Sequence, residues 1–167
     1  YQFPELNRSK MGATVDFKTP EGVELIKMLA KVSDIVIENY SRGVMERSGL
    51  GYDEIRKVRP DIIMMSMPAL GNDGPHADYL AYGLQIMSYI GLADIWGHTE
   101  SSFKARSKVH YPDFVSGATG AVALMAALEH RNISGRGQYI ELAQAEAVAA
   151  TMETAFMDHF INGRTWG

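Results

Sequence analysis

The sequence contains no cysteine among its 167 residues. Disulfide bonds, a thiolate nucleophile and cysteine-ligated zinc are therefore excluded. The same absence fits a reducing compartment, and we expect a cytoplasmic protein. No apolar run approaches the roughly 18 residues that cross a membrane. The opening residues, YQFPELNRSK, also lack the basic start and the apolar stretch of a signal peptide. We therefore expect no membrane partner.

Several short catalytic and cofactor-binding motifs are also missing. The sequence has no GxGxxG dinucleotide fingerprint, no GxxxxGK(S/T) phosphate loop and no GxSxG nucleophile motif. The five histidines do not fall in HExxH or in another metal-ligand spacing, so we expect no metal ion. The formal net charge of −4 argues against a nucleic-acid partner.

The amino-terminal half alternates between strand and helix patterns. Thr19, Pro20 and Glu21 are typical of a helix start, as cap, first-position proline and first-turn acid. The apolar runs DIVIEN and DIIMMSM are typical of strands that are covered on both faces. This alternation predicts an α/β fold, a Rossmann-like parallel sheet flanked by helices. Strands are predicted over 11–17, 34–39 and 61–67, and helices after Thr19, over 43–49 and over 52–60.

The carboxyl-terminal half is mostly helical. Gly135 and Gly137 are expected to end its longest helix. Ligands of parallel sheets bind beyond the carboxyl ends of the strands. Those ends carry the turn-rich segments 38–43 and 66–75, where we expect the ligand site. Helices are predicted over 78–92, 113–130 and 145–161, a polar loop over 93–108 and a strand over 138–144.

Asp113, at the start of the longest predicted helix, has two interpretations. The helix dipole stabilises a first-turn carboxylate by about 0.3–1 kcal/mol, so the residue could be no more than a cap. The small residues behind it, Ser116, Gly117, Ala118 and Gly120, leave room for a ligand or another backbone to approach. An ionised carboxylate in such a place can attack an activated acyl group.

Four polar residues of the amino-terminal half are further candidates. Asn39 and Tyr40 follow a predicted strand, where they either cap and pack or hold a purine base. Lys18 and Arg47 are either solvated charges or phosphate ligands.

Two ring side chains, from separate parts of the sequence, are further candidates. Tyr82 is expected in the core, within the predicted apolar helix, with its hydroxyl bonded to one partner. His110 precedes Asp113 and is either an incidental loop histidine or a base.

Four longer stretches of the sequence carry a family pattern. They are NRSKMGATVDFKTPEG (7–22), DIVIENYSRGVMERSGLGYDEIRKVRPDII (34–63), GNDGPHADYLAYGLQIMS (71–88) and DFVSGATGAVALMAALEHRNISGRGQYIELAQAEA (113–147). In this order they resemble the family III CoA-transferases, which include formyl-CoA transferase, carnitine CoA-transferases and the α-methylacyl-CoA racemases.

The resemblance implies a fold and a set of partners. It implies that residues 1–167 are the central part of a large CoA-binding domain, a fragment of a larger interlocked-dimer fold. The first strand and the carboxyl-terminal part of that fold would lie outside this sequence. The expected partners are coenzyme A, as an acyl-CoA thioester, a carboxylic acid and a second copy of the chain in an interlocked homodimer.

The resemblance also implies roles for individual residues. Asp113 falls at the position of the catalytic aspartate, which attacks the donor thioester to give an aspartyl anhydride and then an aspartyl-CoA thioester. Tyr82 falls at an aromatic position near the acyl group. The residues that fall at positions contacting CoA are Val15, Lys18, Asn39, Tyr40 and Arg47.

Two departures from the family pattern bear on the reaction. Ser41 and Arg42 stand where the family commonly has Arg-Pro, which changes the loop beside the CoA positions. The racemases have a histidine where this sequence has Tyr82. The absence of that histidine favours transfer of CoA over racemisation. The alternatives are an α-methylacyl-CoA racemase, with Asp113 moving a proton at the α-carbon, and a non-catalytic CoA-binding subunit.

Overall fold

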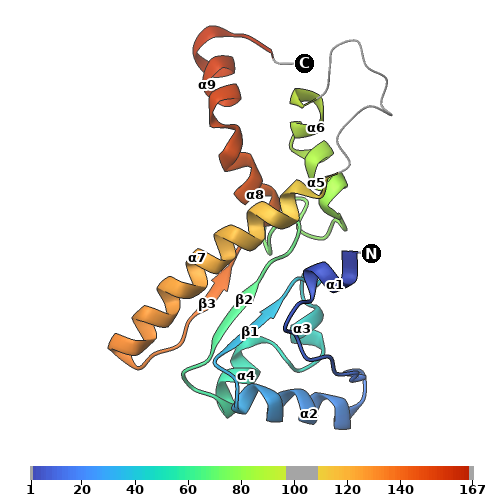
Figure 1. Cartoon of the computed structure of the whole chain (residues 1–167), viewed down its shortest axis with the longest axis vertical. Coiled ribbons are helices and arrows are strands. Elements are labelled where there is room, and N and C mark those ends of the chain that lie inside the picture. The colour runs from blue at the N-terminus through green and yellow to red at the C-terminus, as the bar shows by residue number, and fades with distance from the viewer. Residues whose placement is uncertain (1, 97–108, 166–167) are drawn as a thin grey trace.

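A small parallel sheet forms the centre of the structure (Figure 1). The structure is a computed structural model that describes residues 2–96 and 109–165. Its strands are β1 (Ile35–Glu38), β2 (Ile63–Ser66) and β3 (Tyr139–Glu141), in the order β1-β2-β3. Both pairings are parallel, with Ile35 opposite Ile63 and Met65 opposite Ile140. The predicted parallel sheet is confirmed.

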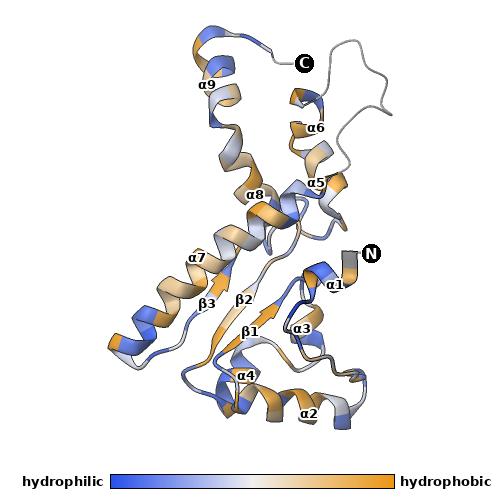
Figure 2. Cartoon of the chain, in the orientation of Figure 1, coloured by the Kyte–Doolittle hydropathy of each residue, from blue (hydrophilic) through white to orange (hydrophobic). Residues whose placement is uncertain are grey.

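The central strand β2 is buried on both faces, because its side chains alternate between two cores. Ile62 and Met64 pack on the side of helices α2 (Pro20–Lys31), α3 (Val44–Arg47) and α4 (Tyr52–Val58). Ile63 and Met65 pack against α7 (Tyr111–Ser134) on the other side. Figure 2 shows the hydrophobic colour concentrated on β1 and β2. The sheet is thus covered by helices on both faces, as the sequence predicts.

Helix α2 begins as predicted. The Thr19 side chain accepts a hydrogen bond from the backbone N–H of Gly22 at 3.1 Å, and Pro20 occupies the first turn. Val23, Ile26 and Ala30 pack into the core beneath the sheet. Leu29, in the last turn of the same helix, is half exposed.

The predicted strand over 11–17 is wrong, because these residues form no strand in the structure. A turn around Asp16 replaces it: its carboxylate accepts from the Lys18 N–H at 3.0 Å, and its carbonyl accepts from the Thr19 hydroxyl at 2.8 Å. Gly22 lies so close to the Asp16 carbonyl that a Cβ would overlap it. The end of the segment is therefore folded onto the start of α2, and Phe17 packs against the core on that side of the sheet.

Strand β1 is less buried than its apolar sequence predicts. Ile37 is 57% exposed, and the other residues of the strand are only partly buried. Among the described residues β1 pairs with β2 alone, so it is an edge strand. Val36 still packs on the α2 side of the sheet and Ile35 on the α7 side, so the expectation that DIVIEN is covered on both faces is confirmed in part.

The predicted helix over 78–92 is divided and begins late. Its helical parts are α5 (Gly83–Tyr89) and α6 (Leu92–Ile95), whereas residues 78–82 are extended or irregular. The predicted polar loop over 93–108 lies largely outside the described residues. The tail is helical as predicted, as α8 (Gln144–Ala149), a 3-10 turn (Ala150–Met152) and α9 (Glu153–Asn162). A further short helix, α1 (Gln2–Leu6), was not predicted.

Helix α7 connects the sheet to the carboxyl-terminal helices. It ends at Gly135, which adopts a left-handed conformation (φ 70°) and donates its N–H to the Arg131 carbonyl at 2.7 Å. Gly120 packs on the sheet, since a Cβ there would meet Met65 Sδ at 3.0 Å. Its small size therefore serves helix–sheet packing. Within the described residues, no helix combines the length and apolarity needed to cross a membrane.

Candidate active site

The candidate site lies where the carboxyl ends of β1 and β2 meet the first turn of α7 (Figure 1). A cavity of about 580 Å³, here called the main cavity, opens there. Asn39, Tyr40, Tyr82, His110 and Asp113 all line it. The structure therefore brings together residues from three separate parts of the sequence at the edge of the sheet where ligands are expected.

Asp113 occupies the first turn of α7 and is not its cap. The cap position is His110, which makes no side-chain capping bond. The Asp113 carboxylate accepts no hydrogen bond from any described residue, and its nearest charged neighbour is His110 Nδ1 at 3.6 Å. Partial burial raises the pKa of Asp113, and the charge of a protonated His110 acts in the opposite direction. A half-exposed carboxylate that accepts no hydrogen bond from the described residues can contact a ligand in the main cavity.

Gly83, which the sequence pattern did not single out, fits closely against this carboxylate. A Cβ on Gly83 would lie 3.2 Å from both Asp113 carboxylate oxygens and 3.1 Å from His110 Nδ1. The first residue of α5 must therefore be small for Asp113 and His110 to keep these positions. A glycine within an apolar pattern was the only signal in the sequence.

Asn39 and Tyr40 form the β1 side of the main cavity. The Tyr40 N–H donates to Glu38 Oε2 at 2.8 Å, which fixes the turn after the strand. The Tyr40 ring packs on Phe17 with the ring centroids 5.7 Å apart. This contact places the segment that contains Val15 and Lys18 next to Tyr40. Val15 is partly buried and Lys18 is exposed, and neither lines the cavity.

Arg47 supports the loop and does not line the main cavity. Its guanidinium donates to the Arg42 carbonyl at 3.3 Å and lies so close to Gly43 that a Cβ there would be 2.5 Å from Nη1. Gly43 has a φ of 74°, a conformation that favours glycine. The cation on the cavity wall is Arg42, which pairs with Asp78 at 3.6 Å and was not predicted as a site residue.

Tyr82 does not belong to the core. It is 78% exposed and precedes α5, with its backbone N–H donating to Gln85 Oε1 at 3.2 Å. Because the helix begins only at Gly83, the Tyr82 side chain lies on the rim of the main cavity. The expected core position is wrong, and Tyr82 lines the same cavity as Asp113.

A smaller pocket of about 210 Å³, here called the inner cavity, adjoins the main cavity. Asn39, Asp113 and Gln144 line both. The inner cavity is also lined by Ser116, from the second turn of α7. From the sequence, Ser116 stands out only for its small size, and Gln144 is not predicted as a site residue. No local pattern shows that the start of α8 lines the same cavity as Asp113.

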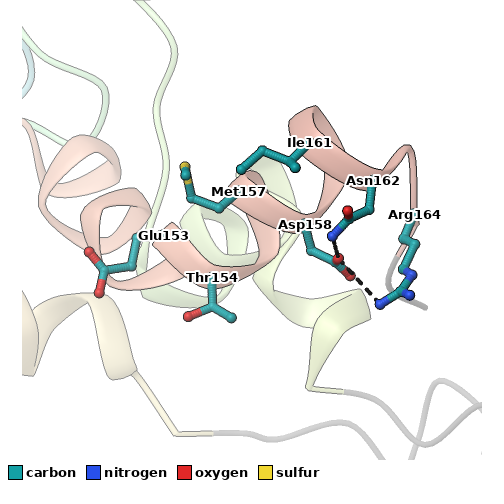
Figure 3. A pocket seen from close by; sticks show the side chains of 7 residues that line it. All are labelled: Glu153, Thr154, Met157, Asp158, Ile161, Asn162 and Arg164. Carbon is teal, nitrogen blue, oxygen red and sulfur yellow. Dashed lines mark hydrogen bonds and ion pairs between the residues drawn. The ribbon is translucent and has the colours of Figure 1, made fainter.

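Another hollow, of about 760 Å³, lies along α9 (Figure 3). None of the predicted site residues lines it. Its carboxylate Asp158 accepts from Asn162 at 2.6 Å and pairs with Arg164 at 3.5 Å. In the described part of the chain, no group of three or more His, Asp or Glu side chains is placed to hold a metal ion.

A family model and the sequences of known proteins both relate this chain to CoA-transferases. The model of CoA-transferase family III matches residues 1–167. The chain is 33% identical over 158 residues to the succinate–glutarate CoA-transferase of Agrobacterium fabrum, covering 95% of this chain and 39% of that protein. It is 31% identical over 161 residues to the succinyl-CoA–D-citramalate CoA-transferase of Chloroflexus aurantiacus, covering 96% and 40%.

A solved structure agrees with these sequence matches. The crystal structure of a CAIB/BAIF family protein from Brucella suis superposes with a TM-score of 0.88 at 30% identity, covering 95% of this chain and 42% of that one. The chain thus spans about two fifths of the length of the proteins that it matches. On the family match over its whole length, the chain belongs to CoA-transferase family III.

Proposed function

We propose that the complete protein containing this chain moves CoA from an acyl-CoA thioester to a carboxylic acid, with Asp113 as the covalent nucleophile. The observation that carries the proposal is the Asp113 carboxylate on the wall of the main cavity, which accepts no hydrogen bond from the described residues and has His110 as its neighbour at 3.6 Å. Partial loss of solvent raises its pKa and makes the ionised form a better nucleophile than a fully hydrated carboxylate.

The proposed reaction exchanges acyl groups without water. An Asp113 oxygen attacks the thioester carbonyl carbon, the C–S bond breaks, and CoA leaves as a thiolate from an aspartyl anhydride. The thiolate then attacks the Asp113 carbonyl carbon of the anhydride, which releases the donor carboxylate and leaves an aspartyl-CoA thioester. The acceptor carboxylate attacks this thioester to form a second anhydride. Attack of the thiolate on the acceptor carbonyl yields the new acyl-CoA and restores Asp113.

We propose that CoA lies along the loop after β1. Asn39 and Tyr40 line the main cavity, and the Phe17–Tyr40 contact holds Val15 and Lys18 beside them. Lys18 and Arg47 are cations suited to the CoA phosphates. Lys18→Ala should therefore raise the KM for acyl-CoA several-fold and leave kcat within about twofold. Lys57→Ala, which removes an exposed lysine on α4, is the matched control.

The nucleophile is tested by chemical trapping. The complete protein is incubated with acyl-CoA and hydroxylamine, digested and analysed by mass spectrometry. Attack of hydroxylamine on the anhydride or thioester should convert Asp113 to a hydroxamate, and omission of acyl-CoA should prevent this. Asp53, an exposed first-turn carboxylate on α4, serves as the internal control and should stay unmodified. Acyl-CoA-dependent turnover without any modified Asp113 would contradict the proposal.

The racemase alternative is separated from transfer by solvent labelling. Incubation with acyl-CoA and an acceptor acid in deuterium oxide should exchange CoA and leave the α-carbon unlabelled. Deuterium at the α-position without CoA exchange would support the racemase. Tight CoA binding with neither result would support a non-catalytic subunit.

A further inference from the structure

Two buried polar atoms beside Asp113 have no hydrogen-bond partner among the described residues: Ser116 Oγ and Gln144 Oε1. Ser116 is completely buried, and Gln144 is 9% exposed. Both residues line the inner cavity. Leaving a buried polar group unpaired is destabilising, so a ligand that pairs with both atoms is bound more tightly.

The orientation of the Gln144 amide is determined by its contacts. Its Nε2 donates to the Met67 carbonyl at 2.9 Å, and its backbone N–H donates to the Pro68 carbonyl at 3.1 Å. Because a carbonyl oxygen can only accept, the amide nitrogen must face Met67. Gln144 Oε1 is therefore left as a hydrogen-bond acceptor.

Ser116 differs from other helical serines of this chain. Ser88 and Ser134 donate their hydroxyls to the carbonyls four residues earlier, at 3.1 and 2.7 Å. Ser116 makes no such bond, although it lies inside α7. Its hydroxyl remains available to donate a hydrogen bond to a ligand in the inner cavity.

A neutral hydroxyl has the donor and the acceptor that these two atoms require. It accepts from the Ser116 hydroxyl and donates to Gln144 Oε1. A carboxylate cannot donate, and it would be repelled by Glu38 and Asp113, since no Lys or Arg lines the inner cavity within the described residues. An ammonium group would leave the Ser116 proton unpaired and would neutralise the carboxylate needed for attack.

We propose that the inner cavity binds a hydroxyl group of the acyl chain, so that the acid to which CoA is transferred is a hydroxy acid. This inference rests on the function proposed above. The inner cavity of about 210 Å³ is several times the roughly 30 Å³ share of one liquid water, so a hydroxyl-bearing carbon chain can enter. Ser116 and Gln144 then determine specificity, because a site built to bond a hydroxyl discriminates against the analogue that lacks it.

Matched pairs of acceptor acids test the proposal in the complete protein. With one acyl-CoA donor, kcat/KM is measured for malate against succinate and for 3-hydroxybutyrate against butyrate. The hydroxylated acid should be preferred by about 10-fold or more in at least one pair. Gln144→Leu and Ser116→Ala should each reduce that preference, measured as the ratio of kcat/KM for the two acids of a pair, about 10-fold. Ser134→Ala, at the far end of α7, should leave the preference unchanged.

A second measurement does not require turnover. The Asp113→Asn protein should bind 3-hydroxybutyryl-CoA about 10-fold more tightly than butyryl-CoA by calorimetry, and Gln144→Leu should remove the difference. Equal affinities for the two thioesters would overturn the hydroxyl site. Equal losses of kcat/KM for both acids of a pair would overturn it as well. In either case the hydroxyl of CoA itself, or a bound water, would be the partner of Ser116 and Gln144. CoA exchange without a hydroxyl preference would refute this inference alone. Hydroxyl-selective binding without CoA exchange under any condition would support the hydroxyl site and refute the proposed transferase.

Discussion

The two ends of α7 hold carboxylates in opposite states. At its amino end, Asp113 accepts no hydrogen bond from a described residue, and burial raises its pKa. At its carboxyl end, Arg131 reaches the loops that precede β1 and β2. There it pairs with Asp34 at 3.0 Å and with Asp61 at 3.9 Å. The same chemical group is thus free at one end and bound at the other.

Neighbouring groups account for the difference. Arg59 Nε donates to Asp61 Oδ1 at 2.6 Å, and this hydrogen bond lowers the pKa of Asp61. The Arg131 side chain is only 13% exposed and also donates to the Asp34 backbone carbonyl at 3.2 Å. The hydrophilic colour at this end of α7 is visible in Figure 2. The paired carboxylates Asp34 and Asp61 lie at the amino ends of the strands, whereas Asp113, the proposed nucleophile, lies beyond the carboxyl ends.

Replacing the free carboxylate should have the largest effect on activity. Asp113→Asn in the complete protein should lower CoA-transfer turnover by roughly 10³-fold or more, because the nucleophile is lost. Stability should not fall, since the carboxylate makes no hydrogen bond with the described residues. Turnover and thermal unfolding are measured together. Asp53→Asn should change neither by much, and an active Asp113→Asn enzyme would contradict the assignment.

Replacing Arg131, at the carboxyl end of α7, should lower stability and leave activity nearly unchanged. Arg131→Met should lower the free energy of unfolding by about 1–3 kcal/mol, because hydrogen bonds to a charged, largely buried group are lost. The value of kcat/KM should stay within about twofold. Denaturant unfolding and initial rates measure the two effects. Arg136→Met removes an exposed arginine that makes no ion pair with the described residues, and should be silent.

Crowding the free carboxylate should give an intermediate effect. Gly83→Ala places a Cβ 3.2 Å from both Asp113 carboxylate oxygens, so the carboxylate must shift by a few tenths of an ångström. We expect kcat/KM to fall roughly 10-fold, because displacement of a reacting group is costly. Steady-state rates measure this.

Gly117→Ala is the matched control for that change. A Cβ at Gly117 meets nothing within 4 Å, and the residue lies inside α7. The kcat/KM of Gly117→Ala should be unchanged, and its free energy of unfolding should rise by about 0.5–1 kcal/mol. If Gly83→Ala retained full activity, the close fit at Asp113 would have no role in the reaction.

The smallest expected effects are on the pH dependence of stability, and their signs differ. The pKa of Asp61 is lowered in the folded state, so its stabilisation is complete above the ordinary aspartate pKa of about 4 and is lost as pH falls through the folded value. Asp61→Asn should therefore flatten the loss of stability below about pH 4. Unfolding by denaturant at a series of pH values measures the slope.

Asp113 should show the reverse dependence. Its folded pKa is raised, so its charge costs stability as pH rises from about 4 through the folded value. Asp113→Asn should be slightly more stable than the wild type at neutral pH and equal to it near pH 3. Slopes of the same sign for the two variants would show that the carboxylates are not in opposite states.

Local sequence determined much of this structure. Thr19 and Pro20 start α2, Gly135 ends α7, and the run DIIMMSM forms a strand buried on both faces, because capping, left-handed turns and alternating burial depend on near neighbours. Resemblance to the family placed Asp113 and Tyr40 in one site, and both line the main cavity.

Tertiary structure decided the rest. The β-prone segment 11–17 turns onto α2, since a strand forms only where a neighbour offers its backbone. Gly83 and Gln144 reach Asp113 from α5 and α8, over separations in sequence that no local pattern reports. The sequence by itself determined which carboxylate begins α7. Only packing decided that Asp113 accepts no hydrogen bond from the described residues while Arg131 reaches Asp34, 97 residues earlier in the chain, because burial and such pairing depend on residues far apart in sequence.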